Sequence, residues 1–226
     1  MTIPRDPILF ISGAGLPAWV WDEVRDLLDV GTTVAPRPAE GTSATLLRYA
    51  EAAIAAAPRG IFAVVAHSVG GVVGAEVARL VPDRVSGFLA VTAAIPEAGQ
   101  SFTSAMPLPN RWVLAAAMRL VGTRPPDKVI RRGLGDELPD DVVERVVAEF
   151  RTESRGLYLD KAAAPSWPAR RGYVATTRDR ELPLSLQERF ARRLDANWED
   201  KIDAGHLPMV QNPKALADSI HRFLAA

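Results

Sequence analysis

Short runs of apolar residues recur along the chain and predict the strands of a buried sheet. The strongest run, residues 61–66 (IFAVVA), is apolar at every position, as expected for a central parallel strand with both faces covered. Residues 8–11 (ILFI) form a second run, which ends at a Ser-Gly turn. The weakest is 32–35, which Pro36 stops. The expected strands are residues 8–11, 32–35, 61–66, 85–91, 172–176 and 198–202.

Apolar residues at helical spacing lie between these runs and predict the covering helices. The segment 42–57 is rich in alanine, with Thr42 or Ser43 as its N-cap and Pro58 beyond its end. The expected helices around the strands are residues 19–30, 42–57, 69–80 and 213–224. Strands and helices thus alternate, which indicates an α/β fold with a mostly parallel sheet and helices on both faces.

Residues 96–167 break this alternation. Helical stretches are expected at 111–121 and 140–150, but the segment contains no convincing strand and holds many prolines and charges. We interpret residues 99–167 as a helical cap inserted into the core, because so long a departure is uncommon without a functional use. The alternative is a pair of ordinary crossover helices with long loops. The cap interpretation divides the chain into core residues 1–98, a cap at 99–167 and core residues 168–226.

The composition is that of a soluble globular protein. Of 226 residues, 48% are hydrophobic and 24% are charged, and 27 basic residues balance 27 acidic ones. Such a balance gives no indication of a nucleic-acid or membrane partner. There is no cysteine, which excludes disulfides and thiolate catalysis, and residues 1–7 do not resemble a secretory signal. A cytoplasmic protein acting on a small molecule is therefore expected, and the oligomeric state is left open.

A serine follows the strongest strand directly, at the point where a helix is expected to begin. The segment Ala66-His67-Ser68-Val69-Gly70-Gly71 approximates the G-x-S-x-G turn, which presents a nucleophilic serine above a parallel sheet. Ala66 replaces the first glycine and is the smallest alternative. A hydroxyl near a helix N-terminus lies where negative charge is favoured. We expect Ser68 to be a nucleophile; the alternative is a tight turn with an incidental serine.

The chain has three histidines, and one of them lies where a general base is needed. His206 follows the last expected strand, at the carboxyl edge of the sheet, where Ser68 also lies. His67 would point away from Ser68 on the turn, and His221 lies in the last helix. We therefore expect His206 to be the base, with His67 beside the substrate site in a supporting role.

A carboxylate is expected to orient this base. Asp179 follows the strand 172–176, and the order Ser68, Asp179, His206 is that of this class of triad. Glu181 and Asp203 lie near the same edge, and Asp203 is the stronger rival because it ends the next strand. An oxyanion would need two N–H donors, one from Val69 and one from the loop 12–15, although that loop could also be a plain glycine-rich turn.

These residues together resemble the α/β-hydrolases that include plant methylesterases, hydroxynitrile lyases and related bacterial hydrolases of small esters. Residues 10–21 (FISGAGLPAWVW) are similar to the family's oxyanion loop, 179–187 (DRELPLSLQ) to its acid loop, and 205–209 (GHLPM) to its histidine loop. The resemblance implies a sheet of about six strands and an oxyanion N–H at Ala14. We expect Gly13, Trp19, His67 and Leu207 to contact the substrate. The likeness does not extend to the segment 99–167.

Departures from the family bear on the activity. Ser12 stands where the family has histidine, so the loop is braced differently. The lyases resembled here use a threonine in the oxyanion loop and a lysine after the histidine, where this chain has Gly13 and Leu207. This disfavours cyanohydrin cleavage and favours hydrolysis of an ester or thioester.

The sequence thus predicts a serine hydrolase that cleaves a small apolar ester, lactone or thioester through an acyl-enzyme. No metal and no organic cofactor is expected. Two alternatives stay open: a non-hydrolytic use of the same triad by a lyase, a cofactor-free perhydrolase or a cyclase, and a ligand-binding protein whose triad is silent.

Overall fold

A computed structural model describes residues 6–108, 110–120, 122–135 and 138–226. Its centre is one six-stranded sheet in which all paired strands are parallel, in the order β2-β1-β3-β4-β5-β6. The strands are β1 (Ile8–Ile11), β2 (Thr32–Val34), β3 (Phe62–His67), β4 (Val85–Val91), β5 (Arg170–Thr176) and β6 (Trp198–Ile202). The expected parallel α/β sheet is confirmed.

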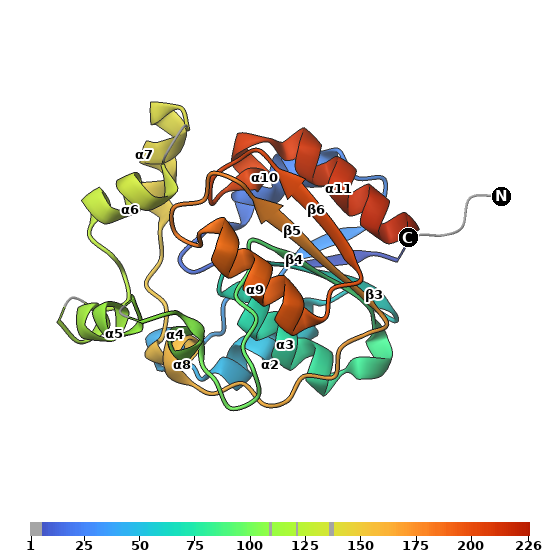
Figure 1. The fold of residues 1–226 in the computed structure, drawn as a ribbon, viewed down its shortest axis with the longest axis horizontal. Helices are drawn as coiled ribbons and strands as arrows, with labels where there is room; N and C mark the ends of the chain where they lie inside the picture. The colour runs from blue at the N-terminus through green and yellow to red at the C-terminus, as the bar shows by residue number, and fades with distance from the viewer. Residues whose placement is uncertain (1–5, 109, 121, 136–137) are drawn as a thin grey trace.

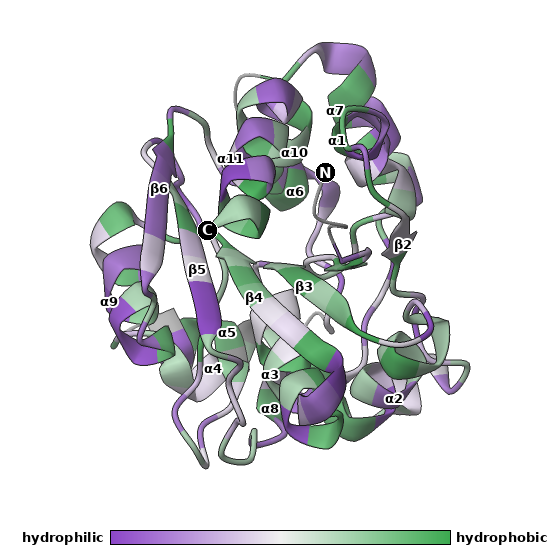
Figure 2. Cartoon of the chain, turned by 90° about the vertical axis from the view of Figure 1, so that its right-hand side faces the viewer, coloured by the Kyte–Doolittle hydropathy of each residue, from purple (hydrophilic) through white to green (hydrophobic). Residues whose placement is uncertain are grey.

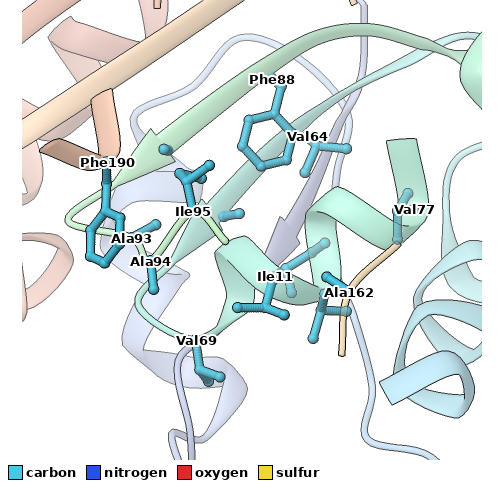
Figure 3. Packing of buried hydrophobic residues seen from close by; sticks show 14 of the residues in the cluster. Ile11, Val64, Val69, Val77, Phe88, Ala93, Ala94, Ile95, Ala162 and Phe190 are labelled. Atoms are coloured by element: carbon cyan, nitrogen blue, oxygen red, sulfur yellow. The ribbon is translucent and has the colours of Figure 1, made fainter. Parts of the chain in front are cut away.

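Alternate residues of β1, β3, β4 and β5 enter separate cores on the two faces of the sheet. Leu9 and Ile11 pack on the face covered by α2 (Leu46–Ala56), α3 (Gly70–Leu80) and α9 (Leu184–Leu194). Ile8 and Phe10 pack on the opposite face with α1 (Asp22–Asp26), α10 (Pro208–Gln211) and α11 (Pro213–Ala225). Figure 1 shows the two helical layers, and Figure 3 shows part of the first core, where residues of the sheet, α3 and α9 meet.

The middle strands and the edge of the sheet differ in polarity. Every residue of β3 is buried, whereas in β6 Ile202 alone is buried and Trp198 and the three charged residues are half-buried or exposed. Figure 2 shows the contrast between the hydrophobic β3 and β4 and the largely hydrophilic β6. Charged residues on an exposed edge strand oppose pairing with another chain.

The described residues between β4 and β5 form helices joined by loops. The segment contains α4 (Phe102–Ala105), α5 (Asn110–Leu120), α6 (Asp127–Leu134), α7 (Asp140–Glu149) and α8 (Arg155–Leu159). In Figure 1, α5, α6 and α7 extend beyond the layered core on its left side. The expected helices near 111–121 and 140–150 correspond to α5 and α7. The division into two core parts and a separate cap stays a prediction.

Several element boundaries differ from expectation. The helix expected at 19–30 is a 3-10 turn (Ala18–Trp21) followed by the short α1, although Trp21 and Val24 are buried as its pattern predicted. The helix expected from residue 42 begins at Leu46, because Thr45 is the N-cap that accepts from the Arg48 N–H, and Gly41–Ser43 forms a separate 3-10 turn. The helix α9 was not predicted. A further 3-10 turn, Pro82–Arg84, precedes β4.

Within the described ranges, no helix is both long and apolar enough to cross a lipid bilayer.

Candidate active site

Ser68 lies on a sharp turn between β3 and α3. Its φ of +55° is in the left-handed region, which costs a non-glycine residue on the order of 1–3 kcal/mol. Its carbonyl accepts from the N–H groups of Gly71 (3.1 Å) and Ala94 (2.9 Å), which hold the turn in this conformation. The serine predicted as nucleophile therefore occupies a strained position that its surroundings maintain.

The close approach of α3 to the sheet explains the small residues around this turn. A Cβ on Gly70 would lie 2.5 Å from the Ile11 carbonyl oxygen, so only glycine fits there. Ala66 is tolerated because it faces Gly74, where an added Cβ would lie 3.3 Å from the Ala66 methyl carbon. The alanine that replaces the first glycine of the turn thus has space provided by a glycine of the helix.

His206 joins the predicted nucleophile to the predicted acid. Its Nε2 lies 3.0 Å from the Ser68 hydroxyl oxygen, and its Nδ1 lies 2.7 Å from Asp179 Oδ2. Its side chain is 5% exposed and that of Asp179 is fully buried. Three residues from distant parts of the chain thus form one hydrogen-bonded series at the carboxyl edge of the sheet.

The Asp179 carboxylate is held as an anion by donors on both oxygens. Oδ1 accepts from the N–H groups of Glu181 (2.8 Å) and Leu182 (2.9 Å), and Oδ2 accepts from the Thr92 hydroxyl. Burial alone would raise the pKa of Asp179, but His206 and these hydrogen bonds lower it to about 2. Burial likewise acts to lower the pKa of His206, but the Asp179 charge raises it above its ordinary value.

Thr92 was missed in the sequence. It follows β4 directly with an unusual φ of +37° and donates its hydroxyl hydrogen to Asp179. The signal that could have revealed it is a lone polar residue that ends an apolar strand at the catalytic edge, next to the strand that carries the acid.

The two rival carboxylates lie elsewhere. Asp203 pairs with Arg178 (3.0 Å) and accepts from the Thr177 hydroxyl (3.0 Å), and its side chain is 77% exposed. Glu181 donates its backbone N–H to Asp179 and is exposed at the cavity described below. The geometry brings Asp179, rather than either rival, to His206.

His67 supports the loop that carries His206. Its Nε2 lies 2.8 Å from the His206 carbonyl oxygen; because a carbonyl only accepts, Nε2 carries the proton. Burial, with the nearby His206, lowers the pKa of His67 to about 3, so the ring is neutral. The ring is completely buried and also lines the cavity over Ser68.

A cavity of about 330 Å³ lies over Ser68 and His206. Gly13, Ala14 and His67 line its base, and apolar side chains of α4–α8 and their connections line much of the rest. The lining side chains from the helical segment include Phe102, Leu114, Met118, Val129, Ile130, Leu134, Phe150 and Tyr158. Among the described residues that line it, Glu181 is the one acidic side chain.

Two residues expected to contact the substrate do not line this cavity. Trp19 lies in the 3-10 turn after Pro17, where the Arg145 guanidinium of α7 stacks 4.0 Å from the centre of its ring. Leu207 is completely buried in the core on the α11 side of the sheet. Neither residue is placed where it lines the cavity over Ser68, because sequence neighbours of a loop residue need not point to the same side as that residue.

The two residues expected to supply oxyanion donors flank the serine. Ala14 lines the cavity beside Ser68, and Val69 is the N-cap of α3, where backbone N–H groups have no partner within the helix. Ser12, which replaces the family's histidine, accepts from the Trp21 indole N–H (2.9 Å) and so braces the loop. A Cβ on Gly13 would lie 2.8 Å from His67 Nδ1, which excludes a side chain there.

The described residues contain no group of three or more histidine, cysteine or acidic side chains arranged to hold a metal ion.

No curated protein matches the chain. Among solved structures, an extracellular α/β-hydrolase from a Paenibacillus species has a TM-score of 0.83 at 20% identity, over 96% of this chain and 98% of that chain. It is described as sharing structural and functional homology with tobacco salicylic acid binding protein 2.

Two further structures extend the comparison. A pyrethroid hydrolase from Sphingobium faniae JZ-2 has a TM-score of 0.73 at 22% identity, over 98% of each chain. The methylesterase MES16 from Arabidopsis has a TM-score of 0.76 at 17% identity, over 97% of this chain and 99% of that one. At these identities the likeness shows a shared fold.

Family membership follows from a sequence profile. The profile of the alpha/beta hydrolase family matches residues 8–219, which include every strand and all three residues of the hydrogen-bonded series. The resemblance noted in the sequence is confirmed: the chain belongs to the alpha/beta hydrolase family and is a hydrolase.

Proposed function

We propose that the protein hydrolyses a small, apolar carboxylic ester, lactone or thioester, with Ser68 as nucleophile, His206 as general base and Asp179 as the acid that orients it. The observation that carries the proposal is the series Ser68–His206–Asp179, with contacts of 3.0 and 2.7 Å, at the base of an apolar cavity. A hydroxyl, an imidazole and a buried carboxylate in this order are the parts that acyl transfer requires.

In the first half of the reaction, Ser68 Oγ attacks the carbonyl carbon and its proton passes to His206 Nε2. Asp179 holds the protonated imidazole by its Nδ1–H and offsets the new positive charge. The carbonyl oxygen becomes an oxyanion, which the N–H groups of Val69 and Ala14 stabilise. Collapse breaks the bond to the leaving group, which takes the proton from His206 and departs as an alcohol or thiol.

In the second half, water replaces the leaving group. His206 takes one proton from the water, whose oxygen attacks the acyl carbon of the ester on Ser68. Collapse returns the proton from His206 to Ser68 Oγ and releases the carboxylic acid. The neutral state of His67 suits this cycle, because a second positive charge beside His206 would oppose its protonation.

The substrate class is inferred from the walls of the cavity. Its volume of about 330 Å³ and its aliphatic and aromatic lining favour a compact apolar acyl or alcohol group. The methylesterase named above acts on esters according to its name, which supports the ester class. Hydrolysis is preferred over cyanohydrin cleavage because Gly13 leaves no room for the lyases' threonine, and Leu207 is buried away from the cavity.

An active-site label tests the proposal. A fluorophosphonate should label Ser68 alone, and a p-nitrophenyl ester should give a burst equal to the enzyme concentration if the acyl-enzyme accumulates. Ser68→Ala should lower kcat by about 10⁵- to 10⁶-fold without unfolding the protein. Ser43→Ala, which changes an exposed serine that does not line the cavity, is the matched control.

Two outcomes would refute it. Labelling of another serine in the folded protein would overturn the nucleophile. Binding of apolar esters without labelling or turnover would instead indicate a ligand-binding protein with a silent triad.

A further inference from the structure

The carboxylate of Glu153 is buried behind the loop that carries Ala14. The proposed reaction has no step in which this carboxylate takes part. The residue is 4% exposed. Its Oε1 accepts from the Gly15 N–H (2.8 Å) and from Arg37 Nε (2.7 Å), and its Oε2 accepts from the Tyr49 hydroxyl (2.7 Å). Burial of a carboxylate is costly unless it is paired and hydrogen-bonded, so these contacts are what stabilises the buried charge of Glu153.

The residues beside Glu153 fix the same glycine from other directions. The Arg151 N–H donates to the Gly15 carbonyl oxygen (3.0 Å). A Cβ on Gly15 would lie 2.2 Å from the Phe150 ring, so the ring is packed directly against the backbone, whose φ is +71°. The segment that leaves α7 therefore clamps Gly15 at its N–H, its carbonyl and its α-carbon.

A guanidinium balances the negative charge of Glu153, and the groups that donate hydrogen bonds to this carboxylate keep their protons. Arg37 pairs with the carboxylate and also donates to the Leu16 carbonyl oxygen (3.0 Å), which anchors the loop one residue farther along. Burial, with the nearby Glu153, raises the pKa of Tyr49 to about 12, so its hydroxyl stays a neutral donor. That hydroxyl oxygen in turn accepts from the Ser154 N–H (3.1 Å).

Glu153 does not border the catalytic cavity. It lines a second cavity of about 240 Å³, whose described lining shares Gly13 and Leu16 with the first, and a third of about 460 Å³, whose described lining shares Gly122 and Thr123 with it. The contacts of its carboxylate with Gly15 and, through Arg37, with Leu16 connect it to the reaction centre by way of the loop. Because peptide units are rigid and planar, fixing the Gly15 N–H and carbonyl restricts how the preceding residue, Ala14, can rotate.

We propose that Glu153 is a positioning residue, which holds the Ala14 N–H where the oxyanion forms. The inference rests on the proposed function. It makes the helical segment between β4 and β5 a part of the oxyanion hole, since residues 150–153 come from that segment. Oxyanion donors act mainly in the transition state, so a misplaced donor lowers kcat with little effect on KM.

The test compares turnover with the binding of a transition-state analogue. A trifluoromethyl ketone is attacked by Ser68 and forms an oxyanion, so its Ki depends on the same donors. For Glu153→Ala we expect kcat to fall by roughly 10- to 100-fold, less than the loss of a whole donor, with KM within about threefold of wild type. The Ki of the ketone should rise in parallel with the fall in kcat.

Glu153→Gln and Glu76→Ala complete the design. Gln keeps an acceptor for the Gly15 N–H but loses the charge that pairs with Arg37, so kcat should lie about three- to tenfold below wild type, above that of Glu153→Ala. Glu76 is 5% exposed, pairs with Arg79 and accepts from the Ala163 N–H, so it is an equally buried tether away from the oxyanion loop. Glu76→Ala should lose stability while kcat and Ki of the folded enzyme stay at wild-type values.

Wild-type kcat and Ki in folded Glu153→Ala would overturn the inference, as would a loss of kcat without a change in Ki. If that variant does not fold, Glu153→Gln decides: an unchanged kcat and Ki would refute the role, and a parallel change of about three- to tenfold would support it. Absence of Ser68 labelling in the wild type would instead refute the proposed function itself.

Discussion

Five groups surround the carboxylate of Asp179: two backbone N–H groups, two threonine hydroxyls and His206. The backbone donors fix Oδ1, which leaves Oδ2 directed at the imidazole. Asn at this position would keep the shape, but its NH₂ group cannot accept the Nδ1–H of His206. The Asp179 carboxylate therefore determines which tautomer of His206 faces Ser68.

Asp179→Asn should lower kcat by about 10³- to 10⁴-fold, because His206 would then present a protonated Nε2 to Ser68. Asp203→Asn and Glu181→Gln should each cost about tenfold or less, since neither carboxylate contacts the imidazole. Kinetics of the three variants on one chromogenic ester provide the measurement. A crippled Asp203→Asn beside a near-normal Asp179→Asn would show that the third member of the triad has been misassigned.

The pH dependence of kcat/KM should show an acid limb from His206. The base works only when neutral, and the Asp179 charge raises the pKa of His206 above its ordinary 6.5, so activity should fall below a midpoint that lies above that value. Glu181 also raises this pKa, so Glu181→Gln should shift the midpoint down, and less so at high salt. Activity that stays constant down to about pH 4 would exclude histidine as the base.

Sequence patterns selected the three residues of the proposed triad but not all of the residues that support them. Ser68, Asp179 and His206 could be selected because each lies within four residues of the end of a predicted strand, at one sheet edge. Glu153 could not, since it lies in a segment without strands and its partners Gly15 and Tyr49 are more than 100 residues away. Contacts of that range depend on how the helical segment folds back, which no local pattern encodes.

At the scale of elements, strands were predictable and helix ends were less so. A fully apolar run such as β3 has one stable environment, between two layers of helices. The segment 19–30 shows the opposite case. Trp21, Val24 and Leu28 are buried as the pattern predicted, but Leu27 is exposed, and the helix is short because the chain has to enter β2 at Thr32. α9 was overlooked, although its buried Leu186, Phe190 and Leu194 have helical spacing.

The contact of α3 with β1 makes a sharp prediction. Gly70→Ala would place a methyl group 2.5 Å from the Ile11 carbonyl oxygen, so the helix must move away from the sheet and the nucleophile turn must distort. We expect a loss of about 1–3 kcal/mol or more in the free energy of unfolding by urea, together with a loss of activity. Gly31→Ala is the control, since its nearest contact would be Pro7 at 3.7 Å and its effect should stay within about 1 kcal/mol. Equal stability of both variants would contradict this packing argument.

At the scale of the whole molecule, positive and negative charges are balanced, whereas the described lining of the cavity includes one acidic side chain. The chain has 27 basic and 27 acidic residues, so its overall field gives little long-range attraction for either sign of substrate. Discrimination by charge must then arise locally. Glu181 is the one acidic side chain among the described residues lining the cavity, and its partners in that lining are mainly apolar.

Esters of equal size that carry a neutral, cationic or anionic substituent should therefore differ in kcat/KM because of the charge of Glu181. We expect kcat/KM for the anionic ester to be roughly tenfold below that of the neutral one, because two charges several ångströms apart near a protein surface interact by on the order of 1–2 kcal/mol. Glu181→Gln should remove most of this difference and any advantage of the cationic ester. Glu188→Gln makes the same change in net charge at a residue that pairs with Lys201 away from the cavity, and should leave the preference intact. If both variants changed the preference equally, the net charge of the molecule rather than this carboxylate would control selection.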